Sequence, residues 1–147
     1  MLVVTPNTCL DITTWLTTLT PGSVARTRRT VASAGGKGVN VCRALRLLGH
    51  QPVLVGLASA QDHRLADLLA AEGCDFASVH HDGPGRIAQI LLEDDGRVTV
   101  LNGPGPTLDD TSWADFLRVV SAKLGGSSIV ACSGSLPPGA PLTAYAD

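Results

Sequence analysis

The stretch at residues 34–40, with the sequence AGGKGVN, has the residue types of a site that binds an anion. Glycines let the backbone approach a ligand closely, and the first turn of a helix offers unpaired N–H groups with a partial positive charge. Lys37 at a helix start would oppose the helix dipole unless an anion lay beside it. We therefore expect a phosphorylated small molecule to bind here. A plain turn is the alternative, because the spacing matches neither a Walker A loop nor the dinucleotide G-x-G-x-x-G motif.

This anion site requires a helix directly after the glycines. Val41, Leu45 and Leu48 recur at i, i+4 and i+7, which is the spacing of one helical face. Gly49 follows them, at the position where a glycine commonly ends a helix. The pattern predicts an amphipathic helix with the glycines outside it, at its entrance.

Elsewhere, apolar β-branched runs alternate with helical patterns, which is typical of an α/β protein with a mainly parallel sheet. Residues 12–33 and 86–101 depart from this alternation and indicate extended segments with turns and no helix. The second segment contains EDDG at residues 93–96, which predicts a hairpin turn. Strands are expected at residues 2–5, 52–57, 76–80 and 128–132, and helices at about 62–72 and 110–124.

The composition of the 147 residues, 44% hydrophobic and 16% charged with a formal net charge of -2, excludes some partners. Nearly balanced charge gives no electrostatic reason to expect nucleic acid or a membrane surface, and no apolar run has the length of a membrane span. Four cysteines stand singly, as expected of reduced thiols rather than disulfides or zinc ligands. We expect one domain or part of one, in the cytoplasm and without a metal site.

Two other groups of residues suggest chemistry less strongly. Ser133 follows an apolar strand, at the sheet edge where α/β proteins usually bind ligands, and a tight turn is the alternative. The same serine would suit a hydrolase with a histidine base, but the G-x-S-x-G motif is absent and prolines follow. The adjacent His80 and His81 would point to opposite faces of a strand, which argues against a shared metal ion.

Several short motifs occur in a recognisable order along the chain. They are N-x-x-L-D at residues 7–11, P-G at 21–22, G-G-K-G-x-N at 35–40, L-N-x-P-G-P at 101–106 and S-G-S-L-P-P-G at 133–139. In this order they resemble the N-terminal part of the ribokinase-like (PfkB) sugar kinases, most of all the branch of 1-phosphofructokinase and tagatose-6-phosphate kinase. The resemblance extends from residue 1 to about residue 147.

The resemblance implies a layered parallel sheet flanked by helices, with a small β-sheet lid at residues of about 10–33 and 86–101. Such a lid closes over the sugar and would allow a homodimer to form through it. Residues 1–147 would be the N-terminal portion of a single sugar-kinase domain. Kinases of this family are about twice as long, so the C-terminal half of the fold would be absent.

Roles for individual residues also follow from the resemblance. Asp11 would accept hydrogen bonds from sugar hydroxyl groups, and Lys37 and Asn40 would meet the sugar phosphate. Arg86 would close over that phosphate bidentately. With the sheet-edge Ser133, the expected substrate-binding residues are Asp11, Gly35, Gly36, Lys37, Asn40, Arg86 and Ser133.

The activity implied by the resemblance is phosphorylation of a sugar phosphate by ATP with Mg²⁺, fructose 1-phosphate giving fructose 1,6-bisphosphate. In the family, the ATP-binding region and the general-base Asp lie in the C-terminal half, so no catalytic residue is expected within this chain. Half of such a site should not catalyse at a useful rate. The alternative is a non-catalytic remnant that binds a sugar phosphate or dimerises.

Overall fold

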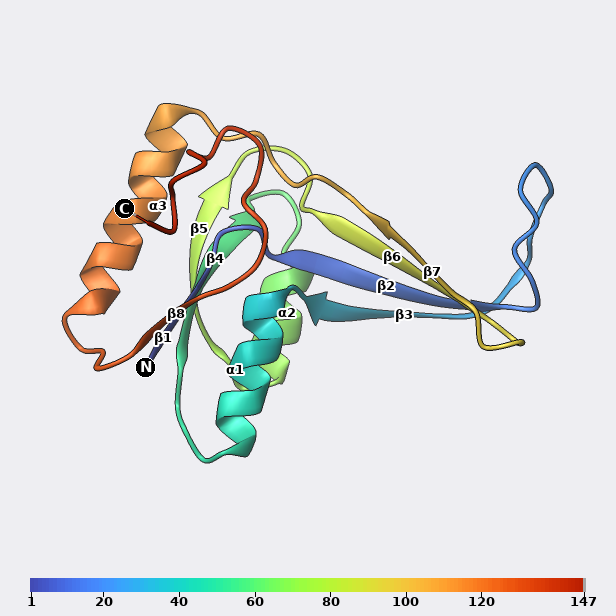
Figure 1. Ribbon diagram of the computed structural model, residues 1–147, viewed down its shortest axis with the longest axis horizontal. Helices are drawn as coiled ribbons and strands as arrows, with labels where there is room; N and C mark the ends of the chain where they lie inside the picture. Colours follow the sequence, from blue (N-terminus) through green and yellow to red (C-terminus); the bar gives the residue numbers. More distant parts are fainter. Residues whose placement is uncertain (147) are drawn as a thin grey trace.

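The strands form two four-stranded sheets in the computed structural model, which describes residues 1–146 (Figure 1). The first sheet is parallel throughout, with the order β5-β4-β1-β8. Its strands are β1 (Leu2–Thr5), β4 (Val53–Ser59), β5 (Asp75–His81) and β8 (Val130–Cys132). They correspond to the four predicted strands with small differences at their ends, so the predicted α/β class is confirmed.

Helices cover both faces of the first sheet. α3 (Asp110–Leu124) packs on one face, and α1 (Lys37–Leu47) and α2 (Arg64–Ala71) pack on the other. Successive side chains of β1 point to opposite faces of the sheet and enter the hydrophobic core on both. Val4 joins the cluster beside α3, and Val3 joins the cluster beside α1 and α2. A strand that is buried on both sides is mostly apolar at successive positions, as Leu2, Val3 and Val4 of β1 are.

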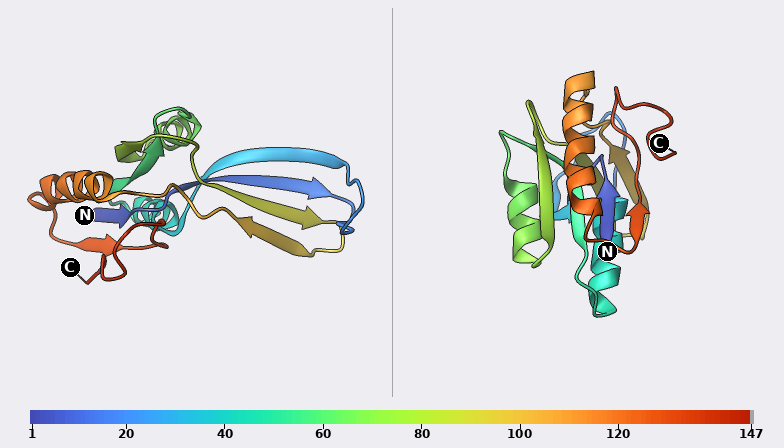
Figure 2. Two further views of the ribbon diagram at one scale, coloured as in Figure 1. Left: turned by 90° about the horizontal axis from the view of Figure 1, so that it is seen from above. Right: turned by 90° about the vertical axis from the view of Figure 1, so that its left-hand side faces the viewer.

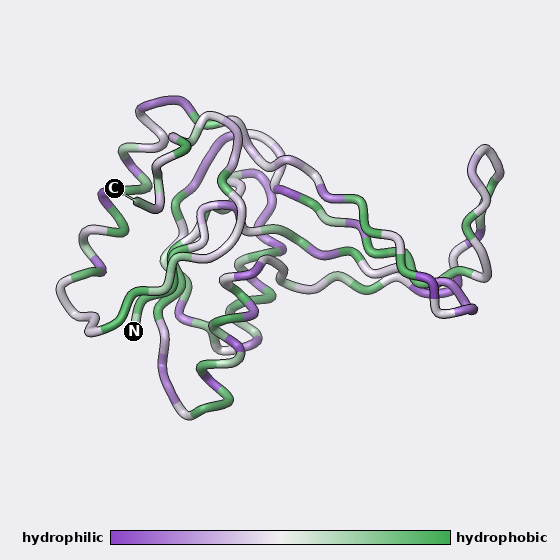
Figure 3. Tube along the Cα trace, in the orientation of Figure 1, coloured by the Kyte–Doolittle hydropathy of each residue, from purple (hydrophilic) through white to green (hydrophobic). Residues whose placement is uncertain are grey.

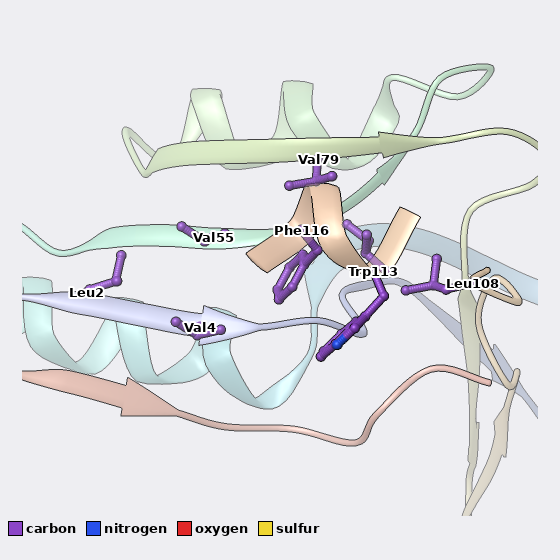
Figure 4. Packing of buried hydrophobic residues seen from close by; sticks show 8 residues of the cluster. Leu2, Val4, Val55, Val79, Leu108, Trp113 and Phe116 are labelled. Atoms are coloured by element: carbon purple, nitrogen blue, oxygen red, sulfur yellow. The ribbon is translucent and has the colours of Figure 1, made fainter. Parts of the chain in front are cut away.

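α3 has the bounds that the sequence predicts. Its start is capped by Asp109, whose carboxylate accepts a hydrogen bond from the N–H of Ser112 at 2.7 Å. Its apolar face carries Trp113 and Phe116, which are buried and stacked with ring centroids 5.3 Å apart. Both rings extend from the helix toward the strands of the first sheet (Figure 4).

α1 begins earlier than the sequence predicts. The helix starts at Lys37, so Gly38 lies within its first turn, and the expectation that all the glycines lie outside the helix was wrong. Gly38 contacts Thr5 of β1, and a Cβ at Gly38 would overlap the threonine side chain. Close approach of helix and strand therefore explains this glycine. Gly49, at φ 84°, follows the end of the helix as predicted.

The second sheet has the order β3-β2-β6-β7. Its strands are β2 (Cys9–Leu16), β3 (Thr27–Gly35), β6 (Ile87–Glu93) and β7 (Val98–Asn102). β2 pairs antiparallel with β3 and parallel with β6, and β6 pairs antiparallel with β7. The two segments predicted to be extended without a helix are confirmed, as is the hairpin turn, where Gly96 has φ 85°.

This second sheet projects from the layered part of the molecule as an arm (Figure 2). The hairpin turn between β6 and β7 at its far end is hydrophilic, whereas β1 and β4 of the first sheet are mainly apolar (Figure 3). Ion pairs at that end join Arg28 to Asp94 and Arg97 to Asp95. Among residues 1–146, no helix is both long and apolar enough to cross a membrane.

Candidate functional site

A cleft of about 390 Å³ lies between the carboxyl edge of the first sheet and one face of the second. The loops after β1 and β8, the start of α1 and strands β2, β6 and β7 contribute to it. Its volume is within the range of small-molecule sites, roughly 300–1,000 Å³. The lining residues are Asn7, Cys9, Asp11, Gly36, Lys37, Asn40, Arg86, Ala88, Ile90, Val100, Asn102, Gly134 and Ser135.

One wall of the cleft is a face of the second sheet. Asp11 on β2 is paired with Ala88 on β6, which is paired with Asn102 on β7, so these side chains lie in one row. Ile90 and Val100 are paired in the next row on the same face. The wall therefore combines a carboxylate, an amide and apolar surface, which suits a ligand with both hydroxyl groups and C–H groups.

The start of α1 forms another side of the cleft. Gly36 precedes the helix at φ 111° and ψ 150°, a conformation that is nearly restricted to glycine. Lys37 is exposed, and the first turn contains no acidic residue. The charge of Lys37 therefore adds to the partial positive charge of the helix start, and together they favour an anion in the cleft.

A hydrogen-bond network orients Asn40. Arg43 Nη1 donates to Asn40 Oδ1 at 2.9 Å, which leaves the NH₂ group of Asn40 as a donor for a ligand. Arg43 also donates to the carbonyl of Ala34 at 2.8 Å and binds Glu72 with two hydrogen bonds, of 2.7 and 2.6 Å. The hydrogen bonds from Arg43 lower the pKa of the Glu72 carboxyl, which keeps this partly buried pair ionised.

Arg86 and Asn7 connect the loops around the cleft. Arg86 donates from Nε to the carbonyl of Gly103 at 2.8 Å and from Nη1 to the carbonyl of Asn7 at 2.9 Å. Asn7 Nδ2 donates in turn to the carbonyl of Pro104 at 3.0 Å and to Ser135 Oγ at 3.2 Å. The guanidinium of Arg86 is thus partly engaged with the backbone. Nη2 takes part in neither of these two hydrogen bonds, so the guanidinium keeps donors for a phosphate.

The carboxylate of Asp11 lies between Cys9 and Gly35. Cys9 Sγ donates to Asp11 Oδ1 across 3.1 Å. A Cβ at Gly35 would overlap the Asp11 carboxylate, so the absence of a side chain at Gly35 makes room for it. Burial, then the hydrogen bond to Asp11 and its charge, raise the pKa of Cys9 to about 12. Cys9 is therefore a protonated donor near neutral pH.

The structure brings most of the predicted site residues to the cleft, namely Asp11, Gly36, Lys37, Asn40 and Arg86. The other two lie beside it. Gly35 packs behind Asp11 and does not line the cleft. The N–H of Ser133 donates to the carbonyl of Val4 at 2.9 Å, and Ser135 lines the cleft in place of Ser133. Their roles in binding stay predictions.

Sequence reasoning missed Asn7, Cys9, Asn102 and Ser135, which also line the cleft. All four stand inside the motifs that carry the resemblance. Cys9 precedes Asp11 by two residues, a spacing that places both on one face of a strand and could have indicated it. The other three are fixed letters of those motifs, and this membership is the sequence signal that could have indicated them.

The hydrolase alternative is not supported, because none of the described residues that line the cleft is a histidine. His80 Nε2 lies 3.2 Å from Ser78 Oγ, and His81 Nδ1 lies 2.9 Å from the carbonyl of Asp82. Within residues 1–146, no group of three or more His, Cys, Asp or Glu side chains could hold a metal ion.

Comparisons with known proteins agree with this architecture. The chain is 29% identical over 140 residues to the 1-phosphofructokinase of Vibrio cholerae serotype O1, covering 95% of this chain and 44% of that protein. The structure of phosphofructokinase-2 from Escherichia coli in complex with fructose-6-phosphate superposes with a TM-score of 0.88 at 28% identity, over 99% of this chain and 48% of that one. A possible 1-phosphofructokinase from Thermotoga maritima gives 0.84 at 29% identity, over 95% and 46%.

The chain thus spans less than half the length of each of these relatives. The superpositions confirm the predicted ribokinase-like class, a parallel sheet flanked by helices with a second β-sheet. The sequence pattern of the pfkB family carbohydrate kinases matches residues 4–147. By this match over nearly its whole length, the chain belongs to the pfkB family of carbohydrate kinases.

Proposed function

We propose that the cleft binds a sugar phosphate and that this chain supplies the substrate-binding part of an ATP-dependent sugar-phosphate kinase. The observation that carries the proposal is the presence of Lys37, at a positive helix start, and the Asp11 carboxylate in one cleft. A ligand that satisfies both has an anionic end and hydroxyl groups. Similarity to 1-phosphofructokinases favours fructose 1-phosphate, with fructose 1,6-bisphosphate as product.

In this proposal each side of the cleft meets a different part of the substrate. Asp11 accepts hydrogen bonds from adjacent sugar hydroxyls, while Lys37 and the NH₂ group of Asn40 donate to the phosphate. The second sheet acts as a lid. Its Ile90 and Val100 offer apolar surface that displaces water from the bound sugar.

ATP and Mg²⁺ are the phosphoryl donor and the ion that such a kinase uses. Mg²⁺ is usually held by one or two carboxylates together with nucleotide phosphates, so it would enter the site with ATP. Residues 1–147 would form the N-terminal portion of the kinase domain, with lid segments at about 10–33 and 86–101. The general base would come from outside this portion.

We also propose a homodimer formed through the lid, in the cytoplasm. Two lid side chains, Val98 and Leu101, are 56% and 53% exposed, and apolar exposure on one sheet favours association. The free thiols Cys9, Cys42, Cys74 and Cys132 suit a reducing compartment. Light scattering of wild type and Val98→Lys tests the dimer, which the lysine should dissociate.

Calorimetric titration of the chain with fructose 1-phosphate, tagatose 6-phosphate, fructose and inorganic phosphate tests the binding proposal. We expect a sugar phosphate to bind more tightly than either fructose or phosphate alone. Equal affinity for phosphate and the sugar phosphates would overturn it. An ADP-release assay with Mg-ATP, run on this chain and on any longer form encoded at the same locus, tests catalysis. Binding without turnover by either form would identify a non-catalytic remnant.

A further inference from the structure

We propose that Cys9 is a positioning residue that fixes the Asp11 carboxylate for the sugar hydroxyl groups, a role that rests on the function proposed above. Cys9 and Asp11 are separated by one residue on β2, so both side chains face the cleft. The thiol of Cys9 donates to Asp11 Oδ1 at 3.1 Å. This hydrogen bond holds Oδ1 in place. Because both oxygens belong to one planar carboxylate, it also fixes the direction in which Oδ2 points.

Gly35 completes the positioning from the neighbouring strand. Cys9 is paired with Gly35 in the antiparallel ladder between β2 and β3. A Cβ at Gly35 would occupy the space of the Asp11 carboxylate. The carboxylate therefore has a thiol on one side and a bare backbone on the other, and few rotamers remain open to it.

The chemistry of the thiol suits a donor and not a nucleophile. Cys9 is 4% exposed, and its burial together with the neighbouring carboxylate raises its pKa to about 12. Arg86 acts in the opposite direction but does not offset these effects. At physiological pH the proton stays on sulfur, so the hydrogen bond to Asp11 persists. A thiolate at this place would repel the carboxylate and move it.

The test compares Cys9→Ala, which removes the donor, with Cys9→Ser, which keeps one. Cys132→Ala serves as the matched control, because Cys132 is exposed on β8 and does not line the cleft. We expect Cys9→Ala to weaken fructose 1-phosphate binding about fivefold, the equivalent of one ordinary hydrogen bond. Serine should restore most of the affinity, while the control and the affinity for inorganic phosphate should not change.

Several results would overturn the positioning role. They are wild-type affinity in Cys9→Ala, no recovery in Cys9→Ser, or an equal loss of affinity for inorganic phosphate, which would indicate a general structural effect. Failure of the wild type to bind any sugar phosphate would instead overturn the proposed function, and the substrate role of Cys9 with it.

A second measurement tests the pairing of Cys9 with Asp11 without any ligand. In Asp11→Asn the negative charge is lost, so Cys9 should ionise more easily and react faster with iodoacetamide at pH 9. Peptide mass spectrometry distinguishes the Cys9 peptide from those of the other cysteines. An unchanged alkylation rate at Cys9, with Cys132 as the internal reference, would show that the two groups do not interact.

Discussion

Lys37 carries its charge at the end of a helix where the backbone is already positive. In the free protein this placement costs stability, and no acidic residue in the first turn of α1 relieves it. A bound phosphate turns the same charge into a favourable interaction. Removal of the Lys37 charge should therefore raise the stability of the free protein and weaken the binding of a phosphate.

The variant Lys37→Gln should show this opposition. We expect its free energy of unfolding without ligand to rise by about 0.3–1 kcal/mol, since an unfavourable charge is removed from the helix start. Its affinity for fructose 1-phosphate should fall about tenfold, the loss of one charge-assisted hydrogen bond. Urea unfolding and calorimetry measure the two effects. Lys123→Gln, near the end of α3, removes a lysine from outside the cleft and should leave the affinity unchanged.

Gly35 affects the site by leaving room for the Asp11 carboxylate and not by contacting the ligand. We expect Gly35→Ala to fold, because Gly35 does not have a positive φ, but to displace the Asp11 carboxylate. Fructose 1-phosphate should then bind at least about tenfold more weakly, while binding of inorganic phosphate changes less. Gly125→Ala, at the end of α3 with φ -60° and no atom within 4 Å of the added Cβ, is the comparison. Equal effects on both ligands would contradict the assignment of Asp11 to the hydroxyl groups.

At the scale of elements, the position of α1 depends on Arg43. This side chain joins the helix to the end of β3 through Ala34 and to the end of α2 through Glu72. It also holds the amide of Asn40. One guanidinium, that of Arg43, thus holds the helix that carries Lys37 to two other elements. The pairing of Arg43 with Glu72 therefore affects both the position of the site residues and the stability of the fold.

The pairing predicts a pH dependence of stability. The pKa of Glu72 is lowered below its ordinary value of 4.5 by Arg43, so the folded state favours the ionised form. The contribution of the Arg43–Glu72 ion pair to the free energy of unfolding is therefore complete above about pH 4.5. It is lost as the pH falls through the lowered pKa of Glu72. In Glu72→Gln, the free energy of unfolding should drop by about 0.5–1 kcal/mol at pH 7, because both side chains are partly exposed. The difference from wild type should shrink by pH 3.

Urea unfolding at both pH values measures this difference. Asp115→Asn removes a more exposed pair with Arg118 on a single helix, and we expect it to change stability much less. A difference for Glu72→Gln that does not depend on pH would show that Arg43 and Glu72 are not paired in solution.

At the scale of the whole molecule, one parallel sheet supports both the core and the cleft. α3 closes one face through Trp113 and Phe116, and α1 closes the other through Val39 and Cys42. The cleft lies between the carboxyl edge of this sheet and the second sheet, and Figure 1 shows the second sheet extending away from the layered part. A substitution that loosens the core on the α3 face should therefore lower the stability of the molecule, although the substituted residue does not contact the site.

Phe116 and Leu117 are neighbours on α3, and comparing them separates the effect of core packing from that of an exposed position on the same helix. Phe116 is 1% exposed and Leu117 is 44% exposed. We expect Phe116→Ala to lower the free energy of unfolding by about 3–5 kcal/mol and Leu117→Ala by less than about 1 kcal/mol. Thermal unfolding followed by circular dichroism measures both. Comparable losses would contradict the packing of α3 against the sheet.

Local patterns allowed much of the architecture to be predicted. The strand at Leu2–Thr5 and the helix at Asp110–Leu124 have the predicted bounds, because an apolar run and a helical face are properties of neighbouring residues. The start of α1 was misplaced because Gly38 owes its identity to Thr5, far away in the chain.

The layered class, the extended segments of the arm and the motifs that contain Asp11, Lys37 and Asn40 could all be recognised from local patterns in the chain. Only the tertiary structure decided that these residues share a cleft with Asn102 and Ser135, and that Ser133 does not line it. It also decided the partners of Arg86 and the contact of Cys9 with Asp11. The reason is physical: periodicity reports which side of an element is buried, whereas the cleft depends on strand register and on hydrogen bonds between distant residues.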